Sequence, residues 1–396
     1  MVSSKRFQRK AMAAAIVLLW FSNYVYVPIL STYAVSRGAS LSMVGMILGS
    51  YGFIQMVSRI PIGILSDSLR NRRIFLQLGM VASIISGLGF YFFTSPGLLL
   101  LFRLLAGLAV SNWAIYITTY TILCKGDNNS KAIGTVNSLN SIGHVGGVFL
   151  GGVIAQYINV ETTFLISALA GFLGFILLQF VDETYEHDEN KKKVSLNDFV
   201  TVFRDSELIF YSSMAILFQI IVASSLTGFV PNLLSDIGAN DFQKGLGTTL
   251  ASLPTIFAAP LAVGFFSKKF GSKWSGIIGF SILSASMFIF PYIKNISVML
   301  GLEFIAGFGK GLLSALLMAC ATSHLPAETR STALSIYQAV YSIGMSVGPA
   351  ITGKISNMFS LRTAFVFLGF TGVISILILL IHGFFNKRKA DRKLST

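Results

Sequence analysis

Long hydrophobic runs, separated by short polar segments, make up most of this 396-residue chain. A run of roughly 20 apolar residues is long enough for a helix to cross the hydrocarbon layer of a membrane. In the first half such runs cover residues 11–34, 42–66, 74–94, 97–124, 132–158 and 162–181. In the second half they cover residues 208–234, 243–266, 275–293, 295–323, 332–357 and 362–385. The pattern predicts an all-α membrane protein with twelve transmembrane helices.

The second half repeats landmarks of the first half about two hundred residues later. Five glycines recur in this way, namely Gly63, Gly107, Gly143, Gly147 and Gly152, which return as Gly264, Gly307, Gly344, Gly348 and Gly353. A repeat of this length is typical of transporters that are built from two related units. We therefore expect two pseudo-symmetric six-helix bundles.

A polar segment separates the two halves near residue 195. It is rich in acidic residues over 182–189 and contains three lysines over 191–193, so it cannot enter lipid. The predicted domains are an N-terminal bundle (1–181), a cytoplasmic linker (182–207) and a C-terminal bundle with a basic tail (208–396). Ser195 and Asp198 have the spacing of a capping box, which favours a short interfacial helix in the linker. The alternative is a solvated tether without a function of its own.

Basic residues are distributed unevenly between the two predicted membrane faces. With the N-terminus placed inside the cell, only five of the 30 Lys and Arg residues fall on the outer side, and three more lie within spans. This asymmetry predicts a multi-pass protein of the cell membrane with both termini in the cytoplasm. The basic N-terminus could also belong to a secretory signal peptide, but the first apolar run exceeds the ~7 to 15 residues of such a signal.

Composition excludes several other classes of protein. The chain is 54% hydrophobic and only 12% charged, and its net charge of +14 comes from loops beside anionic lipid, so no nucleic-acid partner is implied. The two cysteines lack the Cys/His spacing of a metal site. Phosphate-binding loops, nucleophile elbows and zinc-protease motifs are absent from the sequence, so we expect neither an enzyme nor a bound cofactor. Energy for transport should come from an ion gradient or from the solute.

Three motifs carry a resemblance to a known family. The segment Gly63-Ile64-Leu65-Ser66-Asp67, followed by a basic cluster, resembles the loop between helices 2 and 3 of the major facilitator superfamily. Arg103-x-x-x-Gly107 resembles its helix 4 motif. The glycine series at Gly143, Gly147, Gly151 and Gly152 resembles the helix 5 motif of its proton-coupled drug exporters. The resemblance covers the whole chain and implies the major facilitator fold, with similarity to the bacterial drug/proton antiporters.

Some residues depart from these motifs. Ser68 stands where the family often has arginine, Arg70 where it has glycine, and Val148 where the helix 5 motif has proline. That proline is present in the second copy instead, as Pro349. The motifs favour a transporter of this superfamily, but they do not specify its substrate.

Two groups of residues are candidates for gating. Gly63, Asp67, Arg72 and Arg73 lie at the predicted inner membrane edge, where the Asp67 carboxylate could hold a helix N-terminus or the basic loop in one state. A solvated loop aspartate is the alternative. The glycine stripe of Gly143, Gly147, Gly151 and Gly152 lets a neighbouring helix approach closely and rock. Ordinary tight packing is the alternative there.

A few ionisable side chains within the spans are candidates for proton coupling, because an ion in hydrocarbon costs at least a few kcal/mol. The predicted coupling set is Asp67, Arg103, His144, Glu303 and Lys310. Arg103 occupies the position in the first half that Glu303 occupies in the second, so the two could face each other as a proton-sensitive latch or as a static ion pair. His144 could titrate near neutral pH or could simply pack. Arg59 is expected to extend its guanidinium to the inner surface.

Aromatic and amide side chains in the spans provide a candidate binding surface. The predicted substrate-binding residues are Asn23, Tyr24, Asn112, Tyr116, Asn140, Gln219, Ser314, Gln338 and Tyr341. Such a surface suits neutral, cationic or amphipathic organic molecules. On a straight helix Asn112 and Arg103, nine residues apart, point in opposite directions, so both cannot line one narrow cavity.

The resulting hypothesis is a secondary transporter that works by alternating access, functions as a monomer and exports small organic or drug-like compounds in exchange for protons. A proton symporter or uniporter for a polar nutrient such as a sugar is the alternative, because the first span lacks the acidic residue often found in the resembled drug antiporters. A membrane receptor or scaffold without transport activity is a third possibility from another class.

Overall fold

The computed structural model describes residues 4–124, 129–182 and 201–394, which are almost entirely helical. The helices of the first half are α1 (Lys5–Tyr24), α2 (Val27–Ser36), α3 (Leu41–Ser68), α4 (Arg72–Phe92), α5 (Pro96–Ser111), α6 (Trp113–Leu123), α7 (Asn129–Tyr157) and α8 (Val160–Leu178). Those of the second half are α10 (Ser206–Ser224), η1 (Ser225–Phe229), α11 (Val230–Asp236), α12 (Asp241–Ser252), α13 (Thr255–Leu261), η2 (Ala262–Phe266), α14 (Ser267–Ile289), η3 (Phe290–Tyr292), α15 (Ile296–Thr322), α16 (Ala327–Met358) and α17 (Leu361–Leu394).

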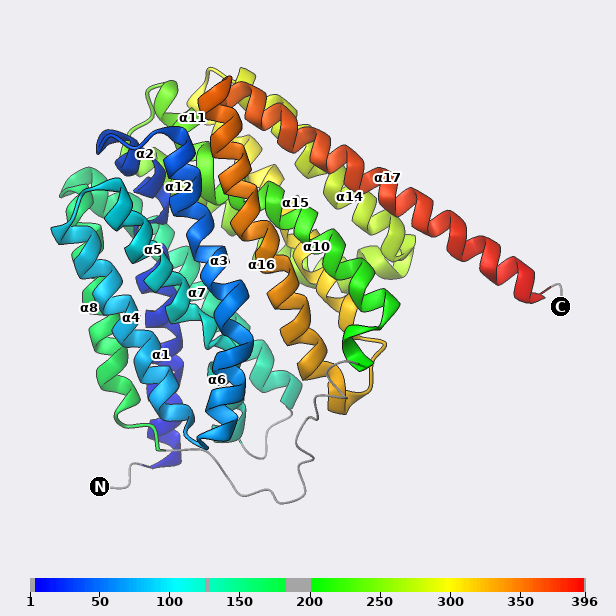
Figure 1. Cartoon of the computed structure of the whole chain (residues 1–396), viewed down its shortest axis with the longest axis horizontal. Coiled ribbons are helices and arrows are strands. Elements are labelled where there is room, and N and C mark those ends of the chain that lie inside the picture. The colour runs from blue at the N-terminus through cyan, green and yellow to red at the C-terminus, as the bar shows by residue number, and fades with distance from the viewer. Residues whose placement is uncertain (1–3, 125–128, 183–200, 395–396) are drawn as a thin grey trace.

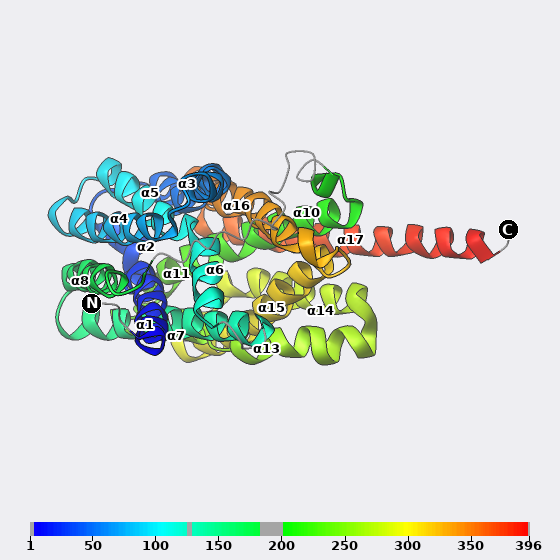
Figure 2. The same cartoon turned by 90° about the horizontal axis from the view of Figure 1, so that it is seen from below.

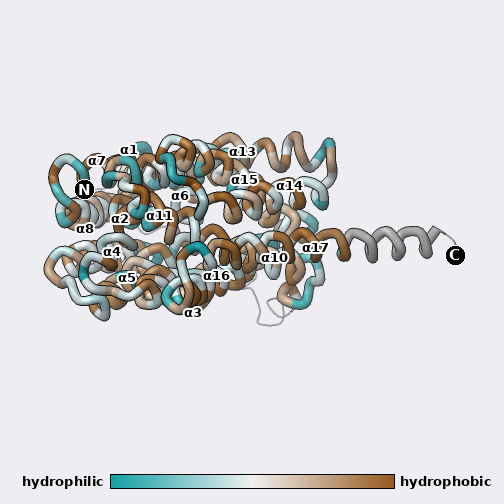
Figure 3. The backbone as a smooth tube through the Cα atoms, turned by 90° about the horizontal axis from the view of Figure 1, so that it is seen from above, coloured by the Kyte–Doolittle hydropathy of each residue, from teal (hydrophilic) through white to brown (hydrophobic). Residues whose placement is uncertain are grey.

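These helices supply the twelve predicted crossings. Ten segments of the described chain are long and apolar enough to cross a membrane, and hydrophobic stretches dominate the backbone trace in Figure 3. One of them, Asp241–Tyr292, reverses direction near Gly271, whose φ of 77° and ψ of 160° are not helical, so it crosses twice. The remaining crossing is α16, a 32-residue helix that packs between α3 and α10. The predicted fold of twelve helices is therefore confirmed.

The helices form two bundles that meet along two pairs of helices. The first bundle contains α1 to α8 and the second contains α10 to α17 (Figure 1). Helix α3 of the first bundle packs on α16 of the second, and α7 packs on α12. Helices α3 and α16 lie together at the end opposite the N-terminus and diverge toward the end where the N-terminus lies (Figure 1). We refer to these ends as the far side and the N-terminal side.

The two halves build the same turn at the first loop on the far side. Gly38 and Gly238 have φ values of 85° and 86°, a left-handed conformation that glycine adopts without penalty. The next residue donates its backbone N–H back into the preceding helix in both halves, from Ala39 to Ala34 over 3.0 Å and from Ala239 to Leu234 over 2.9 Å. This is the Schellman type of helix ending. Equivalent turns 200 residues apart show that the repeat extends to backbone geometry.

The first crossing of each half is broken part-way along its length. Helix α1 ends at Tyr24 and α2 begins at Val27, next to Pro28. In the second half α10 passes through the wider turn η1 before α11 begins, next to Pro231. Proline has no N–H to donate and clashes with the preceding turn, so it interrupts a helix at this point. Broken helices leave backbone and polar side chains near the centre of the bundle, where transporters bind solutes.

Two sequence predictions fall partly or wholly on residues that the structure does not describe. The linker helix with Ser195 and Asp198 belongs to residues 183–200, outside the described residues. The backbone of Asp67 lies in α3, but its side chain is not described. Both remain predictions.

The left-handed turn at Gly38 can be tested by adding a single methyl group. No atom lies within 4 Å of a Cβ built at Gly38, so Gly38→Ala is opposed only by its φ, at a cost of about 1 to 2 kcal/mol. We expect a lower melting temperature for the purified variant. Gly134→Ala is the matched control, because Gly134 is equally open and helical, and it should leave the melting temperature unchanged or raise it slightly. Equal changes in melting temperature for the two substitutions would contradict the left-handed conformation of Gly38.

Candidate functional site

A small cavity lies where the two bundles meet. Its volume is about 40 Å³, room for a few water molecules at most and far below the ~300 to 1,000 Å³ of a drug-binding pocket. Its lining comes from both halves and includes Tyr24, Val27, Leu48, Tyr51, Arg103, Ala223, Thr227 and Met345. The breaks in the first crossing of each half place Val27 and Thr227 here. The cavity is therefore a central junction rather than a formed substrate pocket.

Arg103 is a buried cation in the wall of this cavity. Its guanidinium carbon lies 4.2 Å from the ring centroid of Tyr51, and its Nη1 donates a hydrogen bond of 3.1 Å to the hydroxyl of Tyr26. Its Nε has no hydrogen-bond partner within the described structure. Within the same residues no carboxylate lies within 4.0 Å of Arg103. Aromatic faces, and not an acidic side chain, hold this charge.

Tyr24 connects the cavity with the second bundle. Its ring centroid lies 3.9 Å from that of His144, and its side chain lines the cavity together with Tyr51 and Arg103. His144 on α7 in turn approaches α12, where its Nε2 lies 3.5 Å from the Ser252 hydroxyl. Lys310 on α15 is near enough to act electrostatically on His144. His144, predicted only as a titratable or packing residue, thus lies at the contact between the bundles.

Glu303 is a buried carboxylate inside the second bundle. It is 1% exposed, and its Oε1 has no hydrogen-bond partner within the described residues. It packs against Gly247 of α12, where a Cβ would collide with the carboxylate. Glu303 and Arg103 do not form an ion pair. The latch that we predicted is therefore not formed in this structure, because Tyr26 and Tyr51 hold Arg103 in the first bundle while Glu303 packs within the second.

The structure corrects the expected position of Arg59. Its side chain is 8% exposed and does not extend to the membrane surface. Its Nη2 donates to Oε1 of Gln55 over 2.6 Å, and its Nη1 donates across the bundle contact to Oε1 of Gln338 over 3.0 Å. Its guanidinium carbon is 6.0 Å from the ring centroid of Tyr341. The expectation failed because α16 lies beside this part of α3 and supplies polar partners that are closer than the membrane surface.

Three of the predicted substrate-binding residues are engaged inside the first bundle. Asn23 donates to the Ser83 hydroxyl over 3.1 Å, Asn112 to the Phe75 carbonyl over 2.6 Å and Tyr116 to the Leu76 carbonyl over 3.2 Å. All three acceptors belong to α4, so these side chains fasten neighbouring helices to it. The break between α5 and α6 at Asn112 also removes the straight helix on which its orientation was predicted.

The other predicted residues remain near the bundle contact or along partly exposed faces. Gln338 and Tyr341 on α16 contact Arg59, as described above. The rest are partly buried, namely Asn140 on α7, Gln219 on α10 and Ser314 on α15. The sequence reasoning missed Tyr51, Thr227 and Met345. Pro231, which repeats Pro28 in the second half, was the available signal for the helix break near Thr227.

The glycines that were assigned to gating contribute to two different contacts. Gly143, Gly147 and Gly151 pack on the backbone of α1 within the first bundle, next to Val17, Phe21 and Val25. Gly152 instead faces the second bundle, where a Cβ would lie 2.6 Å from the Cα of Gly245 in α12. The repeat gives a matching contact, because Gly353 of α16 faces Gly45 of α3. Both contacts between bundles lie in the far-side halves of their helices.

On the N-terminal side, the glycine of the loop motif, Gly63, makes no close contact of this kind. A Cβ at Gly63 would find no atom within 4 Å. Arg73 donates to the backbone and side-chain oxygens of Gln179 at the end of α8, over 2.7 and 3.0 Å, which ties α4 to α8 within the first bundle. Arg72 begins α4. The hydrogen bonds between Arg73 and Gln179 therefore hold Arg73 within the first bundle.

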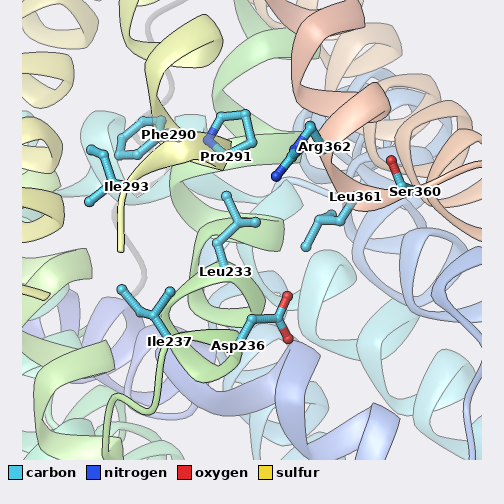
Figure 4. Close-up of a pocket in the computed structure, with 9 residues that line it drawn as sticks. All are labelled: Leu233, Asp236, Ile237, Phe290, Pro291, Ile293, Ser360, Leu361 and Arg362. Carbon is cyan, nitrogen blue, oxygen red and sulfur yellow. The ribbon is translucent and has the colours of Figure 1, made fainter. Parts of the chain in front are cut away.

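A larger pocket of about 400 Å³ lies outside this central region. It is formed by the second bundle alone, at its far-side loops. Figure 4 shows Asp236 and Arg362 at opposite ends of the pocket, with Leu233 between them. Because no residue of the first bundle lines it, this pocket does not belong to the central junction.

Comparison with known sequences decides the family. The sequence profile of the Major Facilitator Superfamily matches residues 12–231 and again residues 212–395. The chain belongs to the Major Facilitator Superfamily. It is therefore a membrane transporter and not an enzyme, as the sequence motifs indicated.

Relatives in this superfamily differ in what they carry. The chain is 24% identical to a homologue of the multi-drug resistance efflux pump PmrA from Lactococcus lactis, over 84% of this chain and 82% of the relative. It is also 24% identical to a probable sugar efflux transporter from Pasteurella multocida, over 95% and 92%. A crystal structure of the nucleoside transporter NupG superimposes with a TM-score of 0.78 at 13% identity, covering 96% of this chain and 99% of NupG.

The adjacent residues Gly151 and Gly152 allow a sharp test of the two glycine contacts of this major facilitator. Gly152→Leu should prevent close approach of α7 and α12 and so favour opening of the far side. We expect a cysteine placed at Thr227, in a background without Cys124 and Cys320, to react several-fold faster with a membrane-impermeant maleimide added from the far side.

Gly151→Leu is the control within the first bundle. Its side chain would meet the backbone of Val25, which caps the end of α1, so it should lower the melting temperature without faster labelling from the far side. Unchanged labelling in Gly152→Leu would show that the contact between Gly152 and Gly245 does not close the far side.

Proposed function

We propose that this transporter works by alternating access as a monomer and exports small organic or drug-like compounds across the cell membrane in exchange for protons. The observation that carries the proposal is Glu303. It is the one acidic residue deep inside the described spans, and it is buried without an ionic partner. A carboxyl group in this setting is suited to carry a proton, because its ionised form is costly unless water or a cation reaches it. The efflux proteins among the relatives support the direction of transport.

The distribution of basic residues supports the orientation in the membrane. Lys5, Arg72 and Arg204 are among the residues at the N-terminal side, which we place in the cytoplasm by the positive-inside rule. The glycine contacts then close the extracellular half of the protein. In this orientation we assign the structure to an inward-facing state, the state in which an exporter takes up its substrate.

The position of Glu303 suggests how exchange can proceed. It lies seven residues from the far-side start of α15, about 10 Å along the axis. Separation of α12 from α7 on the far side would bring outside water toward Glu303, which could then take a proton. Closure of the far side carries that proton inward. The gating roles of Asp67, Arg72 and Arg73 on the cytoplasmic side are part of the same proposal.

Proton coupling can be tested with Glu303→Gln, which keeps the shape of the side chain but cannot change its charge. In proteoliposomes we expect transport by the variant to lose its response to an imposed pH gradient, while exchange of substrate for substrate continues. Glu161→Gln is the matched control, because Glu161 forms a far-side ion pair with Arg37 and should leave the pH response intact. A pH response of normal size in Glu303→Gln removes this residue from the coupling mechanism.

A proton symporter for a polar nutrient is the second candidate. It is favoured by α1, which contains no acidic residue among its described positions. The direction of proton movement discriminates the two candidates. Protons that move against the substrate support export, and protons that move with it support symport. Binding without any flux would instead identify a receptor or scaffold.

A further inference from the structure

We propose that the substrate is an organic anion, with a carboxylate or similar group attached to an aromatic or apolar body. This proposal rests on the proposed transport function and names the class of compound that the central site accepts. Of the neutral, cationic or amphipathic compounds expected from the sequence, it retains an amphipathic one and assigns it a negative charge. The reason is an excess of positive charge at the junction of the two bundles.

Three cations lie around the junction of the two bundles. Arg103 lines the central cavity together with Tyr24. Arg59 bonds to Gln338 across the bundle contact, and its guanidinium carbon lies 6.0 Å from the ring centroid of Tyr341. Lys310 acts electrostatically on His144, whose ring packs on that of Tyr24. The three cations come from α3, α5 and α15, and so from both bundles. No carboxylate lies within 4.0 Å of any of them in the described structure.

Glu303 does not neutralise these charges. It packs against Gly247 and forms no ion pair with Arg103 or Lys310. Even if its full negative charge is counted, the described residues of this region contribute three cations and one anion. A solute cation would add a fourth positive charge, whereas an anion would reduce the excess.

Burial without a counter-charge is costly for the two arginines in particular. Arg59 and Arg103 are 8% and 6% exposed, and each has an Nε without a hydrogen-bond partner among the described residues. A buried charge without a counter-charge costs several kcal/mol. Polar and aromatic neighbours recover part of that cost, but they supply no negative charge. A carboxylate that reaches Arg103 can accept two parallel hydrogen bonds from its guanidinium, a strong and geometrically selective interaction.

The remaining lining fits the organic part of such a compound. Tyr24, Tyr51 and Met345 line the central cavity. Aromatic rings stack well on tyrosine, and methionine adapts to irregular apolar shapes. The cavity itself is too small for such a compound, so binding requires the two bundles to separate further at this level.

Charge selectivity can be measured by binding to the purified transporter without any pH gradient. Three matched series are used, namely benzoate, benzamide and benzylamine; 1-naphthoate, 1-naphthamide and 1-naphthylmethylamine; and indole-3-acetate, indole-3-acetamide and tryptamine. We expect at least one carboxylate to raise the melting temperature and to bind at least ten-fold more tightly than its amide and its amine. Inorganic phosphate is tested beside them.

Several results would overturn the proposal. Amines or amides that bind as tightly as the carboxylates would do so, and so would the absence of stabilisation by every carboxylate. Inorganic phosphate that stabilises as well as the carboxylates would restrict the site to small inorganic anions and remove the organic part of the proposal.

Variants of the cations at the junction test whether these residues determine the charge selectivity of binding. Arg103→Gln should weaken binding of the preferred carboxylate at least ten-fold and leave binding of its amide unchanged, while Arg103→Lys should retain part of the preference. Lys310→Gln provides a second variant if Arg103→Gln does not fold. Arg37→Gln, on the far-side surface, should leave binding unchanged. Carboxylate binding that is unaffected in both Arg103→Gln and Lys310→Gln would contradict the proposal.

These measurements separate the two proposals. Anion-selective binding with no proton flux in proteoliposomes would sustain the substrate class and refute proton exchange. Proton-linked transport of a neutral or cationic compound would sustain the transport mechanism and refute the substrate class.

Discussion

Close backbone contact between the two bundles on the far side is the interaction on which the rest of the structure depends. Lipid chains are as apolar as the helix surfaces, so no hydrophobic force drives two bundles together within a membrane. Contact must come from close packing, which small residues permit. Gly152 meets Gly245 on one side of the molecule, and Gly45 meets Gly353 on the other. The internal repeat makes these contacts symmetric, so the far side closes evenly around the central junction.

This closure encloses the charged side chains of the interior, so their immediate surroundings determine what they can do. Arg103 and Glu303 each lie seven residues beyond the start of their helix, at repeated positions of the two halves. Their surroundings differ, because Tyr51 stacks on Arg103 where the second half has Ala251. The scaffold is repeated while the side chains are not. The result is a cation held by aromatic rings in one bundle and a carboxyl group without an ionic partner in the other.

Sequence patterns predicted the elements well and their neighbours poorly. The apolar runs gave the twelve crossings, and the glycine repeat gave the two related halves. Periodicity also placed Gly143, Gly147 and Gly151 on one face, but it could not say that this face meets α1 while Gly152 meets α12. Helical spacing determines which residues share a face, and only packing determines what that face contacts.

The same limit explains the corrections within the site. Asn23, Asn112 and Tyr116 were predicted to bind the substrate because aromatic and amide side chains offer stacking surfaces and hydrogen-bond partners, yet polar groups within a membrane also need partners of their own. They find those partners on α4, which no local pattern indicates. Arg59 looked close enough to the surface to reach water, but Gln338 lies 279 residues further along the chain and bonds to it. Long-range pairing of this kind has no signature in the spacing of residues along one helix.

The charge imbalance also links the proposed substrate to the movement of the two bundles. Sealing Arg59, Arg103 and Lys310 from water together is unfavourable unless negative charge enters with them. A bound organic anion supplies that charge during the outward step. On the return step the substrate is absent and the proposed proton neutralises Glu303, so the cations rely on their polar and aromatic neighbours alone. Because the cost of closure depends on both the substrate and Glu303, binding at the junction and the protonation of Glu303 influence the same movement without direct contact between them.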